Sequence, residues 1–531
     1  MSSILTRVCP KHKMGASLIS SIMLQLTGQH LSIEEVVRVS RLRDRVAISS
    51  EARERVINAR KFVEKLVEEG RVVYGLTTGF GEFKSVSISK DQTEQLQTNL
   101  IRSHATGVGA PYSEEVVRAA ILIRVNSLLH GHSGVRPEVI DHLVAFLNQD
   151  VYPFVPCQGS VGASGDLAPL SHVMLVLFGE GEVMVNGQRM PSLPVLRQKG
   201  IEPIRLSSKE GLALNNGTAF LTGVGALAVH DAQQLAKVFD IAYGISLESL
   251  MGTISACDER VHALRPHPGQ IACAANMRRL CAQSKIMESH KDCGRVQDAY
   301  SLRCAPQVHG ACRDAIAYVA EVLERELNSV TDNPLLFPDD GVAISAGHFH
   351  GEPVALAMDH LKIAVAELAN ISERRTARLV DPHLSDGLPA FLIPKEEGGL
   401  SSGYMIPQYV AAALVSENKV LAHPASVDSI PTSAGQEDHV SMGSISSRQA
   451  AMVVENTKHV AAIELMCAAQ AADFRKPFTL GLGTNAAHAL IRSVVPMLAK
   501  DRILYTDIEK IETLIPGALV QAVEQAVGRL A

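Results

Sequence analysis

The chain contains no tryptophan and few aromatic residues, because Phe, Tyr and Trp together make up only 4% of its 531 residues. A core must therefore be filled by Leu, Val, Ile, Ala and Met, which suits helix-on-helix packing better than the interior of an aromatic-rich β-sandwich. The length exceeds the roughly 300 residues at which single cores stop growing. Two or more packed units are therefore expected.

Charge of either sign is also sparse, with charged residues at 20% and a formal net charge of −6. This composition excludes the basic surface that nucleic-acid binding requires, and the 46% hydrophobic content excludes a disordered chain. No uninterrupted apolar run reaches the 18 or so residues of a membrane span. We therefore expect neither a nucleic acid nor a membrane as partner, but a small neutral or zwitterionic molecule.

The nine cysteines include no C-x-x-C pair. Five of them lie between residues 273 and 312, at spacings that match no zinc template, so buried free thiols in a reducing compartment are the simpler interpretation. At the N-terminus, Arg7, Lys11 and Lys13 precede a weakly apolar stretch without a clear cleavage site. We expect residues 1–28 to form an extension, either a ragged leader or a first helix, and the protein to be cytoplasmic.

Turn and helix signals place a soft boundary near residue 205. Residues 29–205 mix helices with a short strand at 71–74 and a hairpin at Val183–Met190, where Asn186-Gly187 suits a tight turn. Residues 206–531 contain long amphipathic segments at 217–250, 311–329, 354–377 and 408–422. The predicted fold is mainly α, with a mixed N-terminal domain and an elongated helical bundle.

The loop Gly159-Ser-Val-Gly-Ala-Ser-Gly-Asp-Leu-Ala-Pro-Leu-Ser-His172 is unusual in its run of small residues. It satisfies neither the nucleophile-elbow nor the P-loop pattern, and a tight turn before a helix is its simplest structural interpretation. The tripeptide Ala163-Ser164-Gly165 also permits a cyclisation, in which the Gly165 nitrogen attacks the Ala163 carbonyl. Loss of two waters, one of them from Ser164, would leave an exocyclic methylidene on a five-membered ring, and only small residues let the backbone fold so sharply.

This loop resembles the self-forming 4-methylidene-imidazol-5-one (MIO) site of the histidine and aromatic amino-acid ammonia-lyases. Five further segments resemble blocks of that family in the same order: Tyr74-Gly-Leu-Thr-Thr-Gly-Phe-Gly81, Gly211-Leu-Ala-Leu-Asn-Asn-Gly-Thr218, Gln297-Asp-Ala-Tyr-Ser-Leu-Arg-Cys304, Thr331-Asp-Asn-Pro334 and Gln436-Glu-Asp-His439. The resemblance runs from about residue 29 to the C-terminus. It implies a carbon–nitrogen lyase that forms MIO from Ala163, Ser164 and Gly165, uses no metal, and is a homotetramer with active sites shared between subunits.

The chemistry explains why such a group is needed. Eliminating ammonia from an α-amino acid breaks a barely acidic β C–H bond and expels a poor leaving group, which a base alone cannot achieve at neutral pH. An electrophile that captures the amine makes the nitrogen a better leaving group.

The resemblance assigns roles to individual residues. Tyr74 is the expected general base and Tyr300 a second catalytic tyrosine, whereas Arg303 is expected to bind the substrate carboxylate with its planar guanidinium. Without the resemblance, Tyr74 would be interpreted as a packed side chain, and Tyr300 with Arg303 as a surface pair. Further substrate-binding residues that the resemblance implies are Asn216, Gln297, Phe349 and Gln436; Asn215, next to Asn216, occupies a usually apolar position.

Two further positions bear on the substrate. Ser103-His104 resembles the pair found in histidine ammonia-lyases, and Glu417 stands where histidine-type enzymes carry a glutamate. Read alone, they would be a structural histidine and a solvated carboxylate beside Lys419. Polar groups at the ring end suit imidazole better than phenyl, so the implied reaction converts L-histidine into trans-urocanate and ammonia.

Two departures from the family pattern leave alternatives open. His348 and Gly435 each stand where relatives usually carry Asn, and either change could shift the substrate range toward aryl-alanines. A phenylalanine or tyrosine ammonia-lyase, or an MIO aminomutase, is therefore the alternative function. His348, His350 and Glu352 also have a spacing that could suit a metal, although no further ligand pattern accompanies them. A non-catalytic helical scaffold is disfavoured by the intact tripeptide, Tyr74, Tyr300 and Arg303.

Overall fold

The computed structural model describes residues 23–75, 78 and 92–531, which divide into two compact units. Unit 1 comprises the described residues of Met1–Leu227, Ala320–Met358 and Pro424–Arg448, and unit 2 comprises Ala228–Val319, Asp359–His423 and Gln449–Ala531. The sequence predicted two consecutive domains instead. The difference arises because four long helices each begin in one unit and end in the other: α9 (Ala219–Ser249), α14 (Ala305–Leu327), α15 (Glu352–Val380) and α17 (Gly443–Asp473).

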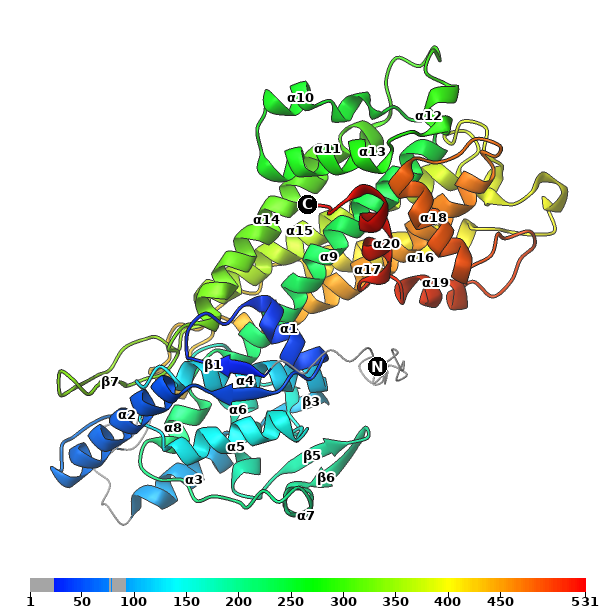
Figure 1. Ribbon diagram of the computed structural model, residues 1–531. Helices are drawn as coiled ribbons and strands as arrows, with labels where there is room; N and C mark the ends of the chain where they lie inside the picture. Colours follow the sequence, from blue (N-terminus) through cyan, green and yellow to red (C-terminus); the bar gives the residue numbers. More distant parts are fainter. Residues whose placement is uncertain (1–22, 76–77, 79–91) are drawn as a thin grey trace. The chain divides into compact units, whose positions relative to one another are not determined.

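Unit 1 combines short helices with four two-stranded pairings. The helices are α1 (Ile33–Arg41), α2 (Ser50–Glu68), α3 (Thr93–His104), α4 (Glu114–Leu128), α5 (Pro137–Asn148), α6 (Leu167–Leu177), α7 (Ser192–Gln198) and α8 (Glu210–Asn215). The strands are β1 (Leu24–Leu26) parallel to β2 (Val46–Ile48), and the antiparallel pairs β3 (Val108–Pro111) with β4 (Pro156–Gln158), β5 (Glu182–Val185) with β6 (Gln188–Pro191), and β7 (Leu335–Phe337) with β8 (Val342–Ile344). Helix α6 contacts α3, α5 and α8, so the segment that follows the small-residue loop is anchored within this unit (Figure 1).

Local signals in the sequence account for several of these elements. Ser32 and Glu35 form a capping box at the start of α1, as a Ser-x-x-Glu spacing before an apolar run favours. The hairpin β5–β6 is confirmed, with Asn186 at φ 51° and Gly187 at φ 80° in its turn. The strand predicted at 71–74 is wrong, because these residues follow α2 without strand pairing; one of them, Val73, packs instead against a cluster that includes Phe62 and Leu336.

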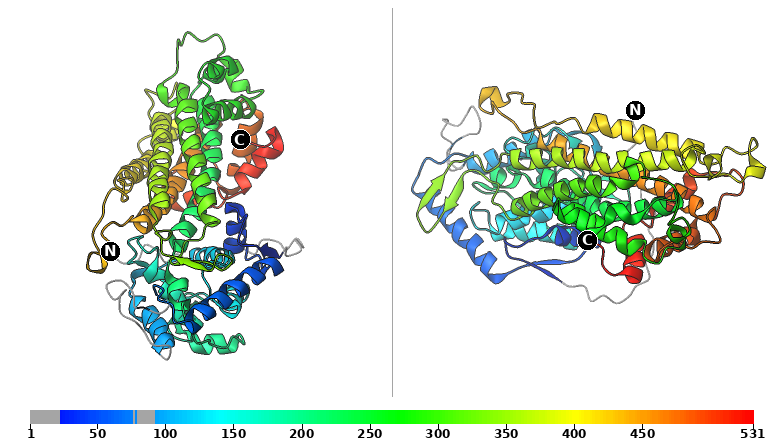
Figure 2. Two further views of the ribbon diagram at one scale, coloured as in Figure 1. Left: turned by 90° about the vertical axis from the view of Figure 1, so that its left-hand side faces the viewer. Right: turned by 90° about the horizontal axis from the view of Figure 1, so that it is seen from above.

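Unit 2 is built from helices. Besides the parts of the four long helices, it contains α10 (Glu259–Ala263), α11 (Pro268–Leu280), α12 (Lys285–Ser289), α13 (Tyr300–Arg303), α16 (Met405–Leu421), α18 (Leu482–Val494), α19 (Tyr505–Glu512) and α20 (Ala518–Val527), with 3-10 turns η3 (Ile254–Cys257), η4 (Ala390–Leu392) and η5 (Lys395–Glu397). The unit 2 parts of α9, α14, α15 and α17 run side by side (Figures 1 and 2). The predicted mainly helical fold is confirmed. None of the described helices is long and apolar enough to cross a membrane.

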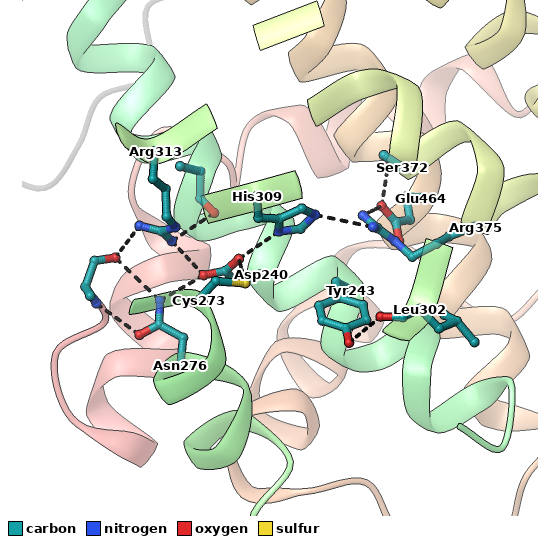
Figure 3. Close-up of polar contacts among 12 residues, drawn as sticks. Asp240, Tyr243, Cys273, Asn276, Leu302, His309, Arg313, Ser372, Arg375 and Glu464 are labelled. Atoms are coloured by element: carbon teal, nitrogen blue, oxygen red, sulfur yellow. Dashed lines mark hydrogen bonds and ion pairs between the residues drawn. The ribbon is translucent and has the colours of Figure 1, made fainter. Parts of the chain in front are cut away.

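A buried network of charged groups joins these four helices within unit 2 (Figure 3). Arg375 of α15 donates to both carboxylate oxygens of Glu464 on α17, at 2.6 Å and 2.8 Å, and also contacts His309 Nε2 at 3.3 Å. His309 Nδ1 lies 2.8 Å from Asp240 of α9, whose other oxygen accepts from Arg313 at 2.6 Å. The network therefore pairs each buried charge with an opposite one. Such pairing is needed because an unpaired charge that is removed from water has a large desolvation cost.

Asp240, Cys273 and His309 also bring three potential metal-ligand atoms within 4.8 Å of one another. Burial alone would raise the pKa of Asp240, but the charge of Arg313 and the bond to His309 hold it well below its usual range. Burial lowers the pKa of His309, which favours a neutral ring between Asp240 and Arg375. The two arginines already supply the positive charge that a cation would bring, so these side chains form a hydrogen-bonded network.

We predict that Arg375→Met will lower the free energy of unfolding by roughly 3 to 5 kcal/mol, because it leaves Glu464 buried without its cation. Arg375→Met combined with Glu464→Met should restore most of that loss. The measurement is the thermal unfolding midpoint, with Glu321→Gln as the control, because Glu321 forms an exposed ion pair with Arg325. An Arg375→Met midpoint equal to that of the control would contradict the prediction.

Candidate active site

The tripeptide Ala163-Ser164-Gly165 lies between β4 and α6 in a sharply turned backbone. Ser164 has φ 51° and Gly165 has φ 70°, both in the left-handed region. A left-handed serine costs conformational energy, so surrounding contacts must hold it there. Those contacts come from two sides, from Gly217 and from the segment 440–443.

Gly217 binds the tripeptide through its backbone. Its N–H donates to Ser164 O at 3.1 Å, and its carbonyl accepts from the Asp166 N–H at 2.7 Å. A Cβ at Gly165 would lie 2.1 Å from Gly217 O, so a side chain at position 165 is incompatible with this approach. The glycine is therefore required by contact as well as by its φ angle.

The other side of the loop packs on residues 440–443. Ala163 forms a small apolar cluster with Val440 and Met442, and the Met442 N–H donates to Val161 O at 2.8 Å. Ser441 Oγ donates to Gly162 O at 2.9 Å. The loop is thus held between two segments that lie far from it in the sequence.

Asp166 ties the loop to the start of α9. One carboxylate oxygen accepts from the N–H groups of Phe220 and Leu221, each at 2.9 Å, and the other accepts from Ser160 Oγ at 2.9 Å. These bonds satisfy donors that the first turn of a helix leaves unpaired. Burial nevertheless raises the pKa of Asp166 to about 6, because the carboxylate is removed from water.

The tripeptide borders a cavity of about 450 Å³ in unit 1. Seven of the predicted site residues line it: Tyr74, His104, Ala163, Ser164, Asn216, Phe349 and Gln436. Ser103 precedes His104 in the chain. Its hydroxyl donates to Leu100 O, and the same Oγ lies 3.0 Å from His104 Nδ1. The structure therefore gathers residues from five of the six sequence blocks around one space.

Four further predicted site residues belong to unit 2: Gln297, Tyr300, Arg303 and Glu417. Gln297, Tyr300 and Glu417 are exposed, and Tyr300 is 71% exposed. The Arg303 guanidinium lies 4.7 Å from the centre of the Tyr300 ring, so these two side chains do form a pair.

Sequence reasoning missed Glu437, which carries the strongest polar contact to the tripeptide. Its carboxylate accepts from Ser164 Oγ at 2.8 Å and from Thr432 Oγ1 at 2.6 Å. It stands directly after Gln436 in a block already noticed, and an acid beside a predicted pocket residue was the available signal.

His104, His350 and His439 also line the cavity. Burial lowers the pKa of His104, although Glu437 acts in the opposite direction, so a neutral ring is favoured. His350 stacks on His439 with ring centres 5.6 Å apart, and both line the cavity. Of the two departures from the family pattern, His348 does not border the cavity, and Gly435 has φ 83°, a conformation that favours glycine.

Asn216 is fixed by a buried polar cluster. Its Nδ2 donates to Asp332 Oδ1 at 3.2 Å and to Asn333 O at 3.3 Å, and Lys209 Nζ lies 2.8 Å from Asp332 Oδ2. The Oδ1 of Asn216 has no hydrogen-bond partner among the described residues. The unusual neighbour Asn215 donates instead to Ser171 Oγ at 3.1 Å, away from Asp332.

Comparison with known proteins decides the family. Residues 31–493 match the profile described as aromatic amino acid lyase. The chain belongs to the aromatic amino acid lyase family. The resemblance inferred from the sequence blocks is thus confirmed.

Individual members are similar over nearly their full length. The chain is 56% identical over 508 residues to a histidine ammonia-lyase of Gloeobacter violaceus, covering 96% of this chain and 98% of the relative. The crystal structure of histidine ammonia-lyase from Trypanosoma cruzi has a TM-score of 0.89 at 44% identity, covering 95% of this chain and 96% of that one. A tyrosine aminomutase from Streptomyces globisporus has a TM-score of 0.91 at 38% identity, covering 96% and 100%.

The buried Asp166 carboxyl predicts a specific pH dependence of stability. Its folded pKa of about 6 lies above the unfolded value of roughly 3.9, so the folded state binds more protons between these values. The contribution of the Asp166 carboxyl to the stability of the folded state is fully present below about pH 4, and it is lost as the pH rises through 6. The wild-type protein should therefore lose roughly 2 kcal/mol relative to Asp166→Asn between pH 4 and pH 7. Melting midpoints of both proteins across this range measure it; a constant difference between them would overturn the assignment.

Proposed function

We propose that this member of the family is a histidine ammonia-lyase, which eliminates ammonia from L-histidine to give trans-urocanate. The observation that carries the proposal is the left-handed Ser164-Gly165 turn, bound to Gly217 and Glu437 at the wall of a cavity that His104 also lines. Relatives that share more than half of their residues with this chain bear that enzyme name.

The tripeptide fits the MIO group. The turned backbone at Ser164 and Gly165 and the lack of a side chain at 165 suit the ring closure, and Ser164 O, which would be the ring carbonyl, already accepts the Gly217 N–H. Glu437 holds the Ser164 hydroxyl, the group lost as water. When formed, MIO supplies an electrophile that takes up the substrate amine and makes its nitrogen a better leaving group.

The chain's own side chains provide the acid–base and binding functions. Tyr74 lines the cavity and is the general base that removes the β proton. Arg303 binds the substrate carboxylate, and Tyr300, in contact with Arg303, handles protons, with Gln297 as a further binding residue. Phe349 and Gln436 complete the cavity wall.

The polar lining of the cavity supports histidine as substrate. His104, Glu437 and His439 offer hydrogen-bonding groups to an imidazole ring, whereas a phenyl ring can make no such bond with them. Ser103 orients the His104 ring through its contact at Nδ1, and Glu417 is a further polar group for the ring or amine. A tyrosine aminomutase shares the fold, so an aminomutase remains the alternative that product analysis must separate.

The enzyme acts as a cytoplasmic homotetramer with active sites shared between subunits. Gln297, Tyr300 and Glu417 are exposed on the single chain, although the proposed chemistry needs them enclosed with the substrate. Apolar side chains are also exposed on α16, with Ile406 at 51% and Val420 at 72%, as subunit contacts would require.

The mass of the intact protein tests the prosthetic group. The purified enzyme should be lighter than its sequence by two waters. Ser164→Ala has no hydroxyl to lose as water and cannot form the methylidene, so it should show a smaller deficit from its own sequence mass, or none, and no turnover. Ser113→Ala, outside the cavity, is the control and should keep both the mass deficit and the activity. Active enzyme with the full unmodified mass would refute the proposal.

Product analysis tests the substrate. L-histidine should give urocanate with a kcat/KM at least about tenfold above that for cinnamate from L-phenylalanine or coumarate from L-tyrosine. His104→Leu should reduce kcat/KM for L-histidine by about tenfold or more, since a hydrogen bond to the ring is lost, and reduce it less for L-phenylalanine. Faster turnover of an aryl-alanine by the wild type, or formation of a β-amino acid, would contradict the assignment.

A further inference from the structure

A buried ion pair lies behind the cavity wall at Asn216. Lys209 is the N-cap residue of α8 and Asn216 its C-cap residue, and their separation of seven positions makes about two helical turns, so both side chains are on the same face. That face meets Asp332, whose two oxygens are divided between them. Lys209, Asp332 and Asn216 are each at most 2% exposed.

The partners of Asn216 determine the orientation of its amide. Asp332 Oδ1 and Asn333 O only accept hydrogen bonds, so the end of the amide that faces them must be the NH₂ group. Asn333 is itself fixed, because its side-chain oxygen accepts from the Ala346 N–H at 2.7 Å and from Ser345 Oγ at 3.1 Å. The amide therefore cannot be turned around without losing both bonds.

This orientation leaves the oxygen of Asn216 for the cavity. Asn216 lines the cavity, its Nδ2 is occupied behind the wall, and its Oδ1 is buried with no partner among the described residues. A buried acceptor without a donor costs free energy, which a ligand with an N–H group would recover. The next residue, Gly217, donates to Ser164 O, so this acceptor lies beside the tripeptide at which the substrate amine reacts.

We propose that Asp332, paired with Lys209, is a positioning residue that holds Asn216 Oδ1 toward the cavity, where it accepts a hydrogen bond from the amino group of the bound amino acid. This inference rests on the proposed function. Lys209 takes an unfavourable φ of 72° at the start of α8, which brings its ammonium group to Asp332 within the same buried cluster. Asp332 Oδ1 also accepts from the Asn333 N–H at 2.7 Å, so Asp332→Asn leaves one oxygen for three donors: Lys209, the Asn333 N–H and the Asn216 amide. When that oxygen turns to the Lys209 ammonium group, Asn216 loses its acceptor and its amide can reverse.

The test measures binding without turnover, in the Ser164→Ala protein, by isothermal titration. The two probes are L-histidine and 3-(imidazol-4-yl)propanoate, which differ only by the amino group. Adding Asp332→Asn should weaken L-histidine binding by about tenfold and leave binding of the deamino analogue unchanged. Equal losses for both probes, or no loss for either, would overturn the proposal.

A double-mutant cycle shows whether Asp332 acts through Asn216. In a protein that already carries Asn216→Ala, adding Asp332→Asn should cause no further loss of L-histidine affinity; a full additional loss would overturn the proposal. Glu210→Gln is the matched control, because Glu210 is a buried acid of α8 paired with Arg136 and should leave affinity unchanged.

Two further outcomes are distinguishable. If the Asp332→Asn protein does not fold, the double variant Lys209→Met with Asp332→Asn removes both buried charges. The same two probes are then titrated against that double variant in the Ser164→Ala protein. If Ser164→Ala binds neither probe, the proposed function itself fails, whereas binding of both probes with no difference between variants overturns only the role of Asp332.

Discussion

The candidate site depends on one backbone contact, the pairing of Gly217 with the loop that carries Ser164. The Gly217 N–H binds Ser164 O, and the Gly217 carbonyl binds the Asp166 N–H. These two bonds hold Ser164 and Gly165 in the left-handed conformation, and the close approach of Gly217 excludes any side chain at position 165. Because Gly217 lies two residues before α9 and Asp166 accepts from N–H groups in the first turn of α9, the loop is fixed to the start of that 31-residue helix.

Buried charge is organised differently in the two units. In unit 2, Arg375, Glu464, His309, Asp240 and Arg313 neutralise one another and join four helices, which is a structural use of ion pairs. In unit 1, Lys209 and Asp332 also neutralise one another, but their pairing ends on an amide that borders the cavity. The difference is that the unit 1 pairing ends at a residue of the cavity lining, Asn216, whose Oδ1 has no partner among the described residues.

The fold was largely predictable because its signals are local. The capping box at Ser32, the Asn186-Gly187 hairpin and the long amphipathic segments each depend on neighbouring residues only. The strand at 71–74 failed for the converse reason. An apolar run of four residues suits a strand or a packed coil equally, and the choice depended on contacts with Leu336, which lies more than 200 residues away.

The sequence by itself determined the chemistry available to this protein: a cyclisable Ala163-Ser164-Gly165 tripeptide, a candidate base in Tyr74 and a family whose blocks stand in a fixed order. Only the tertiary structure decided which polar groups meet that tripeptide. Glu437 follows Gln436 in the chain, yet nothing in the sequence indicates that its carboxylate, rather than the neighbouring amide, contacts Ser164. Likewise the sequence singles out Asn216 and the block that contains Asp332, but not their contact with each other or with Lys209. An ion pair and an amide orientation arise only when distant segments fold together.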